Sequence, residues 1–103
     1  MKKVVLYDHR AEKEMRIFRE DIQEDIRAMI EILGEKGKLE FPEARKVTRE
    51  IFEIRVTREG IYRGFYAYIQ NDRIIILHFF QKKQQKIPQK HIHLAEQRLN
   101  DYV

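Results

Sequence analysis

The stretch IFEIRVTREGIYRGFYAYIQNDRIIILHFF, residues 51–80, decides the fold of this 103-residue chain. It holds three segments rich in β-branched and aromatic residues, at 51–57, 61–69 and 73–80. Arg58-Glu59-Gly60 and Gln70-Asn71-Asp72 separate these segments, and both triplets suit tight turns. The pattern therefore predicts a three-stranded antiparallel meander.

The residues before the meander predict a strand and one or two helices. Residues 2–7 are short and β-branched, as in a strand. Between Asp8 and Leu33 the apolar residues recur at steps of three and four, which is typical of an amphipathic helix. Arg19-Glu20-Asp21 leaves two readings open, one long helix or a helical hairpin in which Asp21 caps the second helix. Gly34 and Gly37 then end the helical pattern.

A loop and a final helix complete the expected order of elements. Residues 35–48 lack a clear period, and we expect a loop with Leu39 and Phe41 held against the core. Pro88 suits a helix start, and the following apolar residues have helical spacing: Ile92, Ala95, Leu99 and Tyr102. The order indicates one α+β domain over residues 1–103, with helices packed on one face of a twisted sheet.

Composition excludes several classes of protein. The chain has no cysteine, so it can form neither a disulfide framework nor a sulfur-based zinc or thiolate site. The opening apolar run ends at Tyr7, too early for a signal peptide, and no later run reaches membrane-spanning length. We expect a cytoplasmic protein without a membrane partner.

The positive charge is unevenly distributed. Residues 1–50 hold twelve Lys/Arg and twelve Asp/Glu, whereas residues 51–103 hold nine and five, so the second half carries the whole net charge of +4. No acidic residue lies between Arg73 and Ala95. A basic zone of this kind attracts phosphate or an acidic partner, although an ordinary solvated surface has the same composition.

The turns determine which strand residues share a face. A three-residue loop with Gly60 left-handed places Arg55 opposite Arg63, whereas a two-residue loop would separate the two arginines. A two-residue turn at Asn71-Asp72 would place Phe80 opposite Arg63 and His78 opposite Phe65. The other face would then carry a helix-covered core of Phe52, Ile54, Val56, Tyr66, Tyr68, Ile75, Leu77 and Phe79.

The polar face combines cations with aromatic rings. Arg55, Arg63, Phe65, His78 and Phe80 would form one surface, and further cations lie at its edge or near it: Lys82, Lys83, Lys86, Arg58 and Lys90. Single-stranded RNA is bound by such a surface, because cations neutralise phosphates while unstacked bases lie on exposed rings.

Each candidate also has a structural interpretation. Arg63 in an apolar strand suits an ion pair with Glu53, and Arg58 suits a plain turn residue. His78 suits a hydrogen-bonded packing position. Glu12 and Glu14 are interpreted as ordinary helix-surface charges. The sequence carries no Gly-rich phosphate loop, and His91 and His93 would point apart on a helix, so we expect neither a cofactor nor a metal.

The second half of the chain resembles the phage-derived HigB-like branch of the RelE/ParE toxin superfamily. The resemblance is carried by FEIR at 52–55, GIYRGFY at 60–66, IILHFFQKK at 75–83 and KIP at 86–88, and it continues through Ala95, Arg98 and Leu99. The family usually has threonines where Gln84 and Ile87 stand here.

The resemblance implies a toxin of a type II toxin-antitoxin pair, acting as an mRNA endoribonuclease in the ribosomal A site. An antitoxin, often of the helix-turn-helix type, would hold it inactive. Arg63 matches the family's strand arginine, which would stabilise the transition state, and Arg55 and Lys83 fall near further basic positions. We add His78 as a catalytic candidate. Two alternatives stay open, a ParE-like gyrase inhibitor and a non-catalytic antitoxin-binding module.

Overall fold

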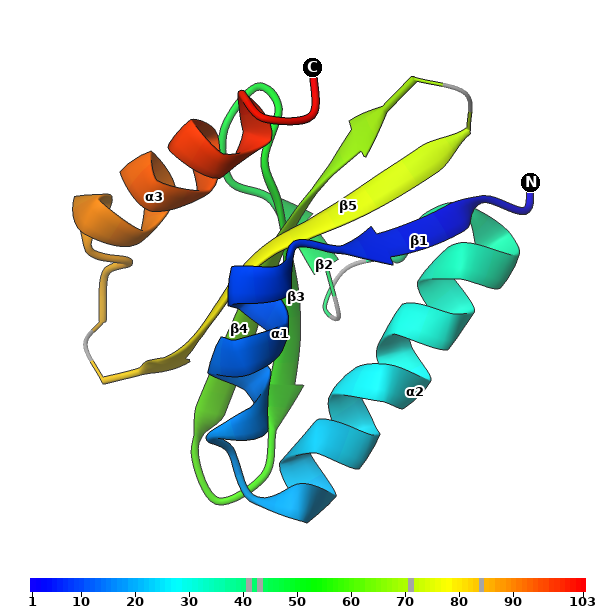
Figure 1. Cartoon of the computed structure of the whole chain (residues 1–103). Coiled ribbons are helices and arrows are strands. Elements are labelled where there is room, and N and C mark those ends of the chain that lie inside the picture. The colour runs from blue at the N-terminus through cyan, green and yellow to red at the C-terminus, as the bar shows by residue number, and fades with distance from the viewer. Residues whose placement is uncertain (41, 43, 71, 84) are drawn as a thin grey trace.

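A computed structural model describes residues 1–40, 42, 44–70, 72–83 and 85–103, and it has the predicted α+β architecture (Figure 1). Its sheet has five strands in the order β1-β5-β4-β3-β2. Strands β3, β4 and β5 form the predicted antiparallel meander, β1 pairs in parallel with β5, and β2 pairs antiparallel with β3. The strand bounds are β1 Val4–Tyr7, β2 Ala44–Lys46, β3 Phe52–Thr57, β4 Ile61–Ile69 and β5 Arg73–Lys82.

The helices are α1 His9–Arg16, α2 Glu20–Lys36 and α3 Gln89–Leu99. The helical-hairpin interpretation is therefore confirmed against the single long helix. Asp8 caps α1, because its side chain accepts a hydrogen bond from the backbone N–H of Arg10. The prediction that Asp21 caps α2 was wrong. Asp21 lies in the first turn of this helix, and Arg19 holds the cap position. Gly37, at φ +80°, ends α2.

Helices cover both faces of the sheet, so the prediction that they pack on one face was wrong. One buried cluster joins α1 and α2 to Ile74, Ile76 and Phe79, whereas a second joins α3 to Ile75 and Leu77. Alternate residues of a strand point to opposite faces. Because Ile75 and Leu77 are as apolar as Ile74 and Ile76, each face of β5 needs its own cover.

Both predicted pairings at the polar end of the meander are confirmed. The first hairpin pairs Thr57 with Ile61, and Arg55 stands opposite Arg63. Its loop holds Gly60 at φ +143° and also Glu59 at φ +52°. In the second hairpin Arg63 pairs with Phe80, and Phe65 pairs with His78.

The second hairpin has this register at its polar end, but its turn and the pairing next to the turn differ from the prediction. Ile69 pairs with Arg73, so three positions separate the paired residues instead of two; Asn71, part of the predicted turn, lies outside the described residues. The register then shifts between Phe65 and Tyr66, where Leu77 is the extra residue of a β-bulge. The two deviations cancel at the polar end, but they move Ile75 and Leu77 onto the α3 face.

The edges of the sheet were less predictable than its centre. Strand β2 lies inside the segment that we expected to be a loop, and it pairs Arg45 with Glu53. Leu39 packs against the core as expected, whereas Phe41 lies outside the described residues. No helix in the described part of the chain is long and apolar enough to cross a membrane.

Candidate functional site

A basic groove of about 480 Å³ lies between the β2 edge of the sheet and the start of α3. Strands β2 to β5 contribute five of its cationic side chains, and residues next to β2, before α3 and in α3 complete its walls. Its cations are Arg45, Lys46, Arg55, Arg63, Lys82 and Lys86, joined by apolar contacts from Val47, Ile87 and Ile92. Among the described residues, no acidic side chain lines this basic groove.

At the floor of the basic groove, Arg63 belongs to a buried ion pair. Arg63 is only 2% exposed, and its Nη1 donates to the Glu53 carboxylate. The structural interpretation of Arg63 is thus confirmed. Arg45 approaches the other carboxylate oxygen, with Nε–Oε1 4.0 Å. One buried carboxylate consequently faces more than one guanidinium, which leaves excess positive charge on the groove floor.

Several polar atoms at this floor have no hydrogen-bond partner in the described part of the chain: Nε of Arg55, Nε of Arg63 and Oε1 of Glu53. A buried donor without an acceptor costs about 1–3 kcal/mol. These two buried guanidinium N–H groups therefore leave positive potential at the groove that no acceptor among the described residues offsets.

Lys82 is the central cation of this end of the molecule. It lines the basic groove and also two neighbouring hollows that contain Lys83. Burial and the nearby Arg63 and Arg55 lower the pKa of Lys82, because each disfavours its charged form. Lys83 is exposed and does not line the basic groove itself, whereas Lys86 does.

The aromatic part of the predicted surface is not exposed. Phe65 is completely buried and Phe80 is 7% exposed, because α3 packs over both rings. The prediction that they present open stacking platforms for bases was wrong. The two rings are buried because helices cover both faces of the sheet, so that α3 lies on the face that we had assigned to the ligand.

His78 is buried in a hydrogen-bonded chain between α1 and α3. Its Nδ1 lies 2.8 Å from Oε1 of Glu14, and its Nε2 lies 2.8 Å from Nδ1 of His91. The ring of His91 in turn stacks on Phe80, with centroids 4.0 Å apart. His78 therefore has the packing role foreseen for it, and it is also linked through His91 to the surface.

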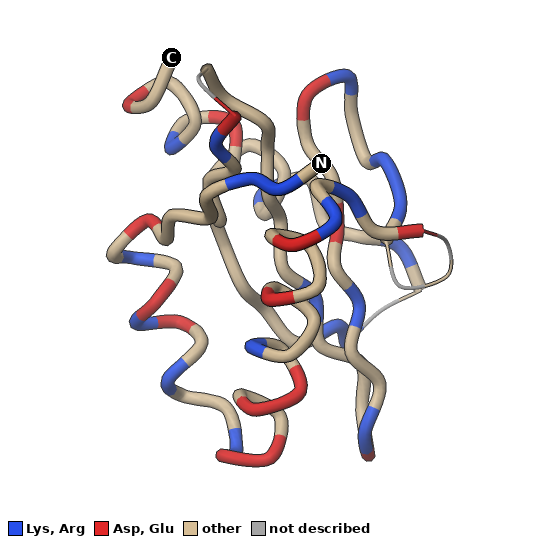
Figure 2. The backbone as a smooth tube through the Cα atoms, turned by 90° about the vertical axis from the view of Figure 1, so that its right-hand side faces the viewer, with Lys and Arg blue, Asp and Glu red and all other residues tan. Residues whose placement is uncertain are grey.

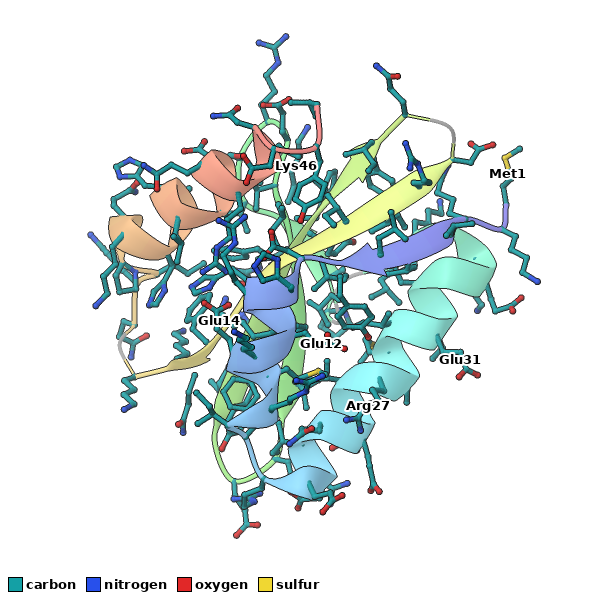
Figure 3. All side chains as sticks on the ribbon, in the orientation of Figure 1. Met1, Glu12, Glu14, Arg27, Glu31 and Lys46 are labelled. Carbon is teal, nitrogen blue, oxygen red and sulfur yellow. The ribbon has the colours of Figure 1, made fainter. Side chains whose placement is uncertain are left out.

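Glu14 is not the surface charge that we predicted. It lies on the side of α1 turned toward α3 (Figure 3), where both guanidinium nitrogens of Arg98 donate to it at 3.0 Å. Although burial alone would raise it, the hydrogen bonds from His78 and Arg98 lower the pKa of Glu14 overall.

Glu14 and Arg98 also complete the edge of β5 beyond the end of β1. Glu14 accepts the backbone N–H of Phe79 at 3.1 Å, and Arg98 donates to the carbonyl of Leu77 at 2.8 Å. These side chains satisfy backbone groups that a neighbouring strand would otherwise pair. No local sequence signal indicates this arrangement, since α1 and α3 are separated by most of the chain.

The remaining predicted RNA-contacting residues lie in different places. Lys90 begins α3 and lines a hollow of about 130 Å³ with Lys82, Lys83 and His91. Arg58 lies away from the basic groove in the first hairpin loop, where its Nε binds Asp25 on α2 at 2.8 Å. The structure thus brings together all the predicted cations except Arg58.

The charge distribution over the backbone agrees with this division. In Figure 2, α2 at the centre carries mostly acidic positions, whereas the segment around β2 at the right edge is mostly basic. No group of three His, Cys, Asp or Glu side chains that could hold a metal occurs in the described ranges.

Comparison with known proteins assigns the chain to a family. The model of the family described as phage-derived protein Gp49-like matches residues 13–100, and the chain belongs to this family. The fold is shared with a solved structure of a mutant of the E. coli toxin RelE in the free state, with a TM-score of 0.70 and 15% sequence identity over 100% of both chains. No curated protein sequence matches.

Proposed function

We propose that this protein is the toxin of a toxin-antitoxin pair and an endoribonuclease that cleaves mRNA in the ribosomal A site, as in the HigB-like branch. The observation that carries the proposal is the basic groove, with Arg55 and Arg63 paired across two strands and Lys82 and Lys86 at its rim. The Gp49-like family and the RelE-like fold support the assignment to this class.

The proposed reaction is attack of a ribose 2′-hydroxyl on the adjacent phosphate. This reaction builds negative charge on the phosphorane, and preorganised cations stabilise such charge most effectively where water is excluded. Arg63, held rigidly by Glu53, and Arg55, whose Nε has no acceptor among the described residues, supply that field. Lys82 and Lys86 bind the neighbouring phosphates, and Lys83 and Lys90 extend the binding surface along the RNA.

We propose a cognate antitoxin protein, with mRNA and the ribosome, as partners in the cytoplasm. The net charge of +4 and the acid-free segment 74–94 favour an acidic antitoxin segment that competes with RNA for the same groove. A protein that binds this groove would block Arg55, Arg63, Lys82 and Lys86 at once.

The test is translation in vitro, with primer extension on the message. The wild-type protein should produce cuts at defined codon positions. Arg55→Ala should reduce the cleavage rate by roughly 10²-fold, as expected for the loss of a main electrostatic stabiliser. Arg63→Ala should be at least as damaging, but it also breaks a buried ion pair, so its folding is checked by circular dichroism.

Arg27→Ala is the matched control, because Arg27 is an exposed arginine of α2 that does not line the basic groove (Figure 3). It should cleave like the wild type. Absence of codon-positioned cuts, or cuts unaffected by Arg55→Ala, would contradict the proposal. Inhibition of gyrase supercoiling with translation intact would instead indicate the ParE-like alternative.

A further inference from the structure

Three side chains from distant parts of the sequence form one continuous hydrogen-bonded chain. Glu14 on α1, His78 on β5 and His91 on α3 are linked by two contacts of 2.8 Å each. His78 is buried, whereas Glu14 and His91 are half-buried, and His91 lines two hollows at the surface. The chain thus connects a half-buried carboxylate through a buried imidazole to an imidazole at the surface.

The hydrogen bonds determine where the protons lie in the neutral pair. When the histidine pair is neutral, His78 donates its Nδ1–H to Glu14, and its Nε2 accepts the Nδ1–H of His91. The Nε2 of His91 then carries a free lone pair. One extra proton can stay on His91, which is then the imidazolium, or pass to His78, which then donates from both nitrogens while His91 becomes the Nε2–H tautomer. The second arrangement places the extra charge on His78, beside the Glu14 carboxylate.

We propose that Glu14, His78 and His91 form a proton relay in which His91 is the general base that removes the proton of the attacking 2′-hydroxyl. This inference rests on the proposed function, since it names the base for that reaction. His91 is the residue that touches the substrate, and His78 and Glu14 are positioning residues that receive and stabilise the proton.

The position of His91 relative to the cations suits this role. It shares a hollow of about 130 Å³ with Lys82, Lys83 and Lys90, and Lys82 also lines the basic groove. A phosphate held by Lys82 is therefore bordered by the arginines on one side and by His91 on the other. Stacking of the His91 ring on Phe80, at an interplanar angle of 9°, holds the plane of the imidazole.

One proton moves along the relay while the phosphodiester bond is cleaved. The 2′-hydroxyl proton moves to Nε2 of His91, the Nδ1 proton of His91 moves to Nε2 of His78, and a bond forms between O2′ and phosphorus. The P–O5′ bond breaks, and O5′ takes a proton from water. The products are a 2′,3′-cyclic phosphate and a 5′-hydroxyl, and the relay returns its proton to solvent.

The charged groups around the pair favour a neutral resting state of His91. Burial, followed by His78 and Lys90, lowers the pKa of His91, and Glu14 opposes this only partly. Arg98 from α3 neutralises part of the Glu14 charge, and Lys82 and Lys83 border the same hollow. A neutral imidazole is the form that a general base requires near neutral pH.

The relay is tested on the free protein by nitrogen-15 NMR of the histidine rings during a pH titration. At high pH, His91 should be the Nδ1–H tautomer. As the pair takes up one proton, His91 should switch to the Nε2–H tautomer while His78 becomes the imidazolium. Direct conversion of His91 to the imidazolium, with His78 still neutral, would overturn the relay.

The role of Glu14 is tested by Glu14→Gln in the same titration. Loss of the carboxylate should move the uptake of the extra proton by the histidine pair to lower pH, because the negative charge beside His78 is gone. An unchanged titration in a folded variant would contradict the proposal. If Glu14→Gln does not fold, the tautomer switch in the wild type remains decisive.

The catalytic part is tested by cleavage with His91→Gln and with His93→Gln as its control, since His93 is exposed on the same helix. His91→Gln should lose about 10²–10⁴-fold in rate and keep RNA affinity. Wild-type cleavage by His91→Gln, or equal losses of rate and affinity, would refute a base. If the wild type itself cleaves nothing, the proposed function fails, and the titration alone then judges the relay.

Discussion

At the scale of single residues, Arg63 has two roles, because it forms a buried ion pair and also contributes positive charge to the basic groove. Its Nη1 is bound by Glu53 inside the sheet, while its Nε has no partner within the described residues. The ion pair holds the guanidinium still, and the unpaired N–H keeps part of its field available at the basic groove. Buried ion pairs contribute little net stability compared with apolar residues, although breaking one is costly. This pair is therefore explained better by positioning than by stability.

We predict that Glu53→Gln destabilises the protein by about 3–5 kcal/mol, because it leaves the buried Arg63 charge uncompensated. The double variant Glu53→Leu/Arg63→Met should recover most of that stability, since neither charge then remains. Urea unfolding measures both effects. The double variant should fold and yet fail to cleave RNA; full cleavage by it would contradict the role of Arg63.

At the scale of elements, the end of the β4–β5 hairpin supports the whole site. Gly64 lies opposite Phe79, and a Cβ added to Gly64 would approach Cε1 of Phe79 to 2.5 Å. The missing side chain lets the Phe79 ring fill the space over β4 on the α1 and α2 face. Neighbouring residues of the same two strands, Arg63 and His78, face the other side and form the site.

We predict that Gly64→Ala destabilises the protein by about 1–3 kcal/mol through overpacking against Phe79. Gly34→Ala is its control, because a Cβ there meets Val5 at the milder distance of 3.2 Å and gains helix propensity in α2. Thermal unfolding of both variants should show a clearly larger loss for Gly64→Ala. Equal losses would mean that the Phe79 contact is not the limiting one.

At the scale of the whole molecule, the buried carboxylate of Asp8 and the half-buried carboxylate of Glu14 hold the ends of the chain together. Asp8 accepts hydrogen bonds from Arg10 and from the hydroxyl of Tyr102, and Arg10 also binds Asp101. Glu14 similarly ties α1 to Arg98 on α3. Although burial opposes it, hydrogen bonding from Arg10 and Tyr102 lowers the pKa of Asp8 well below its ordinary value.

These lowered pKa values predict a loss of stability in acid. A carboxyl group with a folded pKa below its unfolded pKa contributes stability that is complete above the unfolded value and is lost as pH falls through the folded value. The ordinary values are 3.8 for Asp8 and 4.5 for Glu14, so the melting temperature should fall below about pH 4.5. Asp8→Asn should melt lower at pH 7 and show a weaker fall; a parallel curve would exclude Asp8 as a source.

The excess of cations predicts salt-dependent binding of RNA. The affinity for a single-stranded RNA should fall as salt rises, with a slope of about 0.7 per phosphate contact in a plot of log K against log salt. Lys86→Ala should reduce the slope by about that amount. Arg27→Ala should leave it unchanged, and an equal reduction in both variants would show that the contact is not localised to the groove.

Much of this protein was determined by local sequence. The three strands, the confirmed Arg55–Arg63 pairing and the clustering of cations after β5 follow from residue alternation and turn chemistry within about 35 residues. Only the tertiary structure decided which face α3 covers, and with it the burial of Phe65, Phe80 and His78. The same holds for the Glu14–Arg98 pair. A strand's period shows that two faces exist, but which helix covers each depends on the total apolar area that distant segments must bury together.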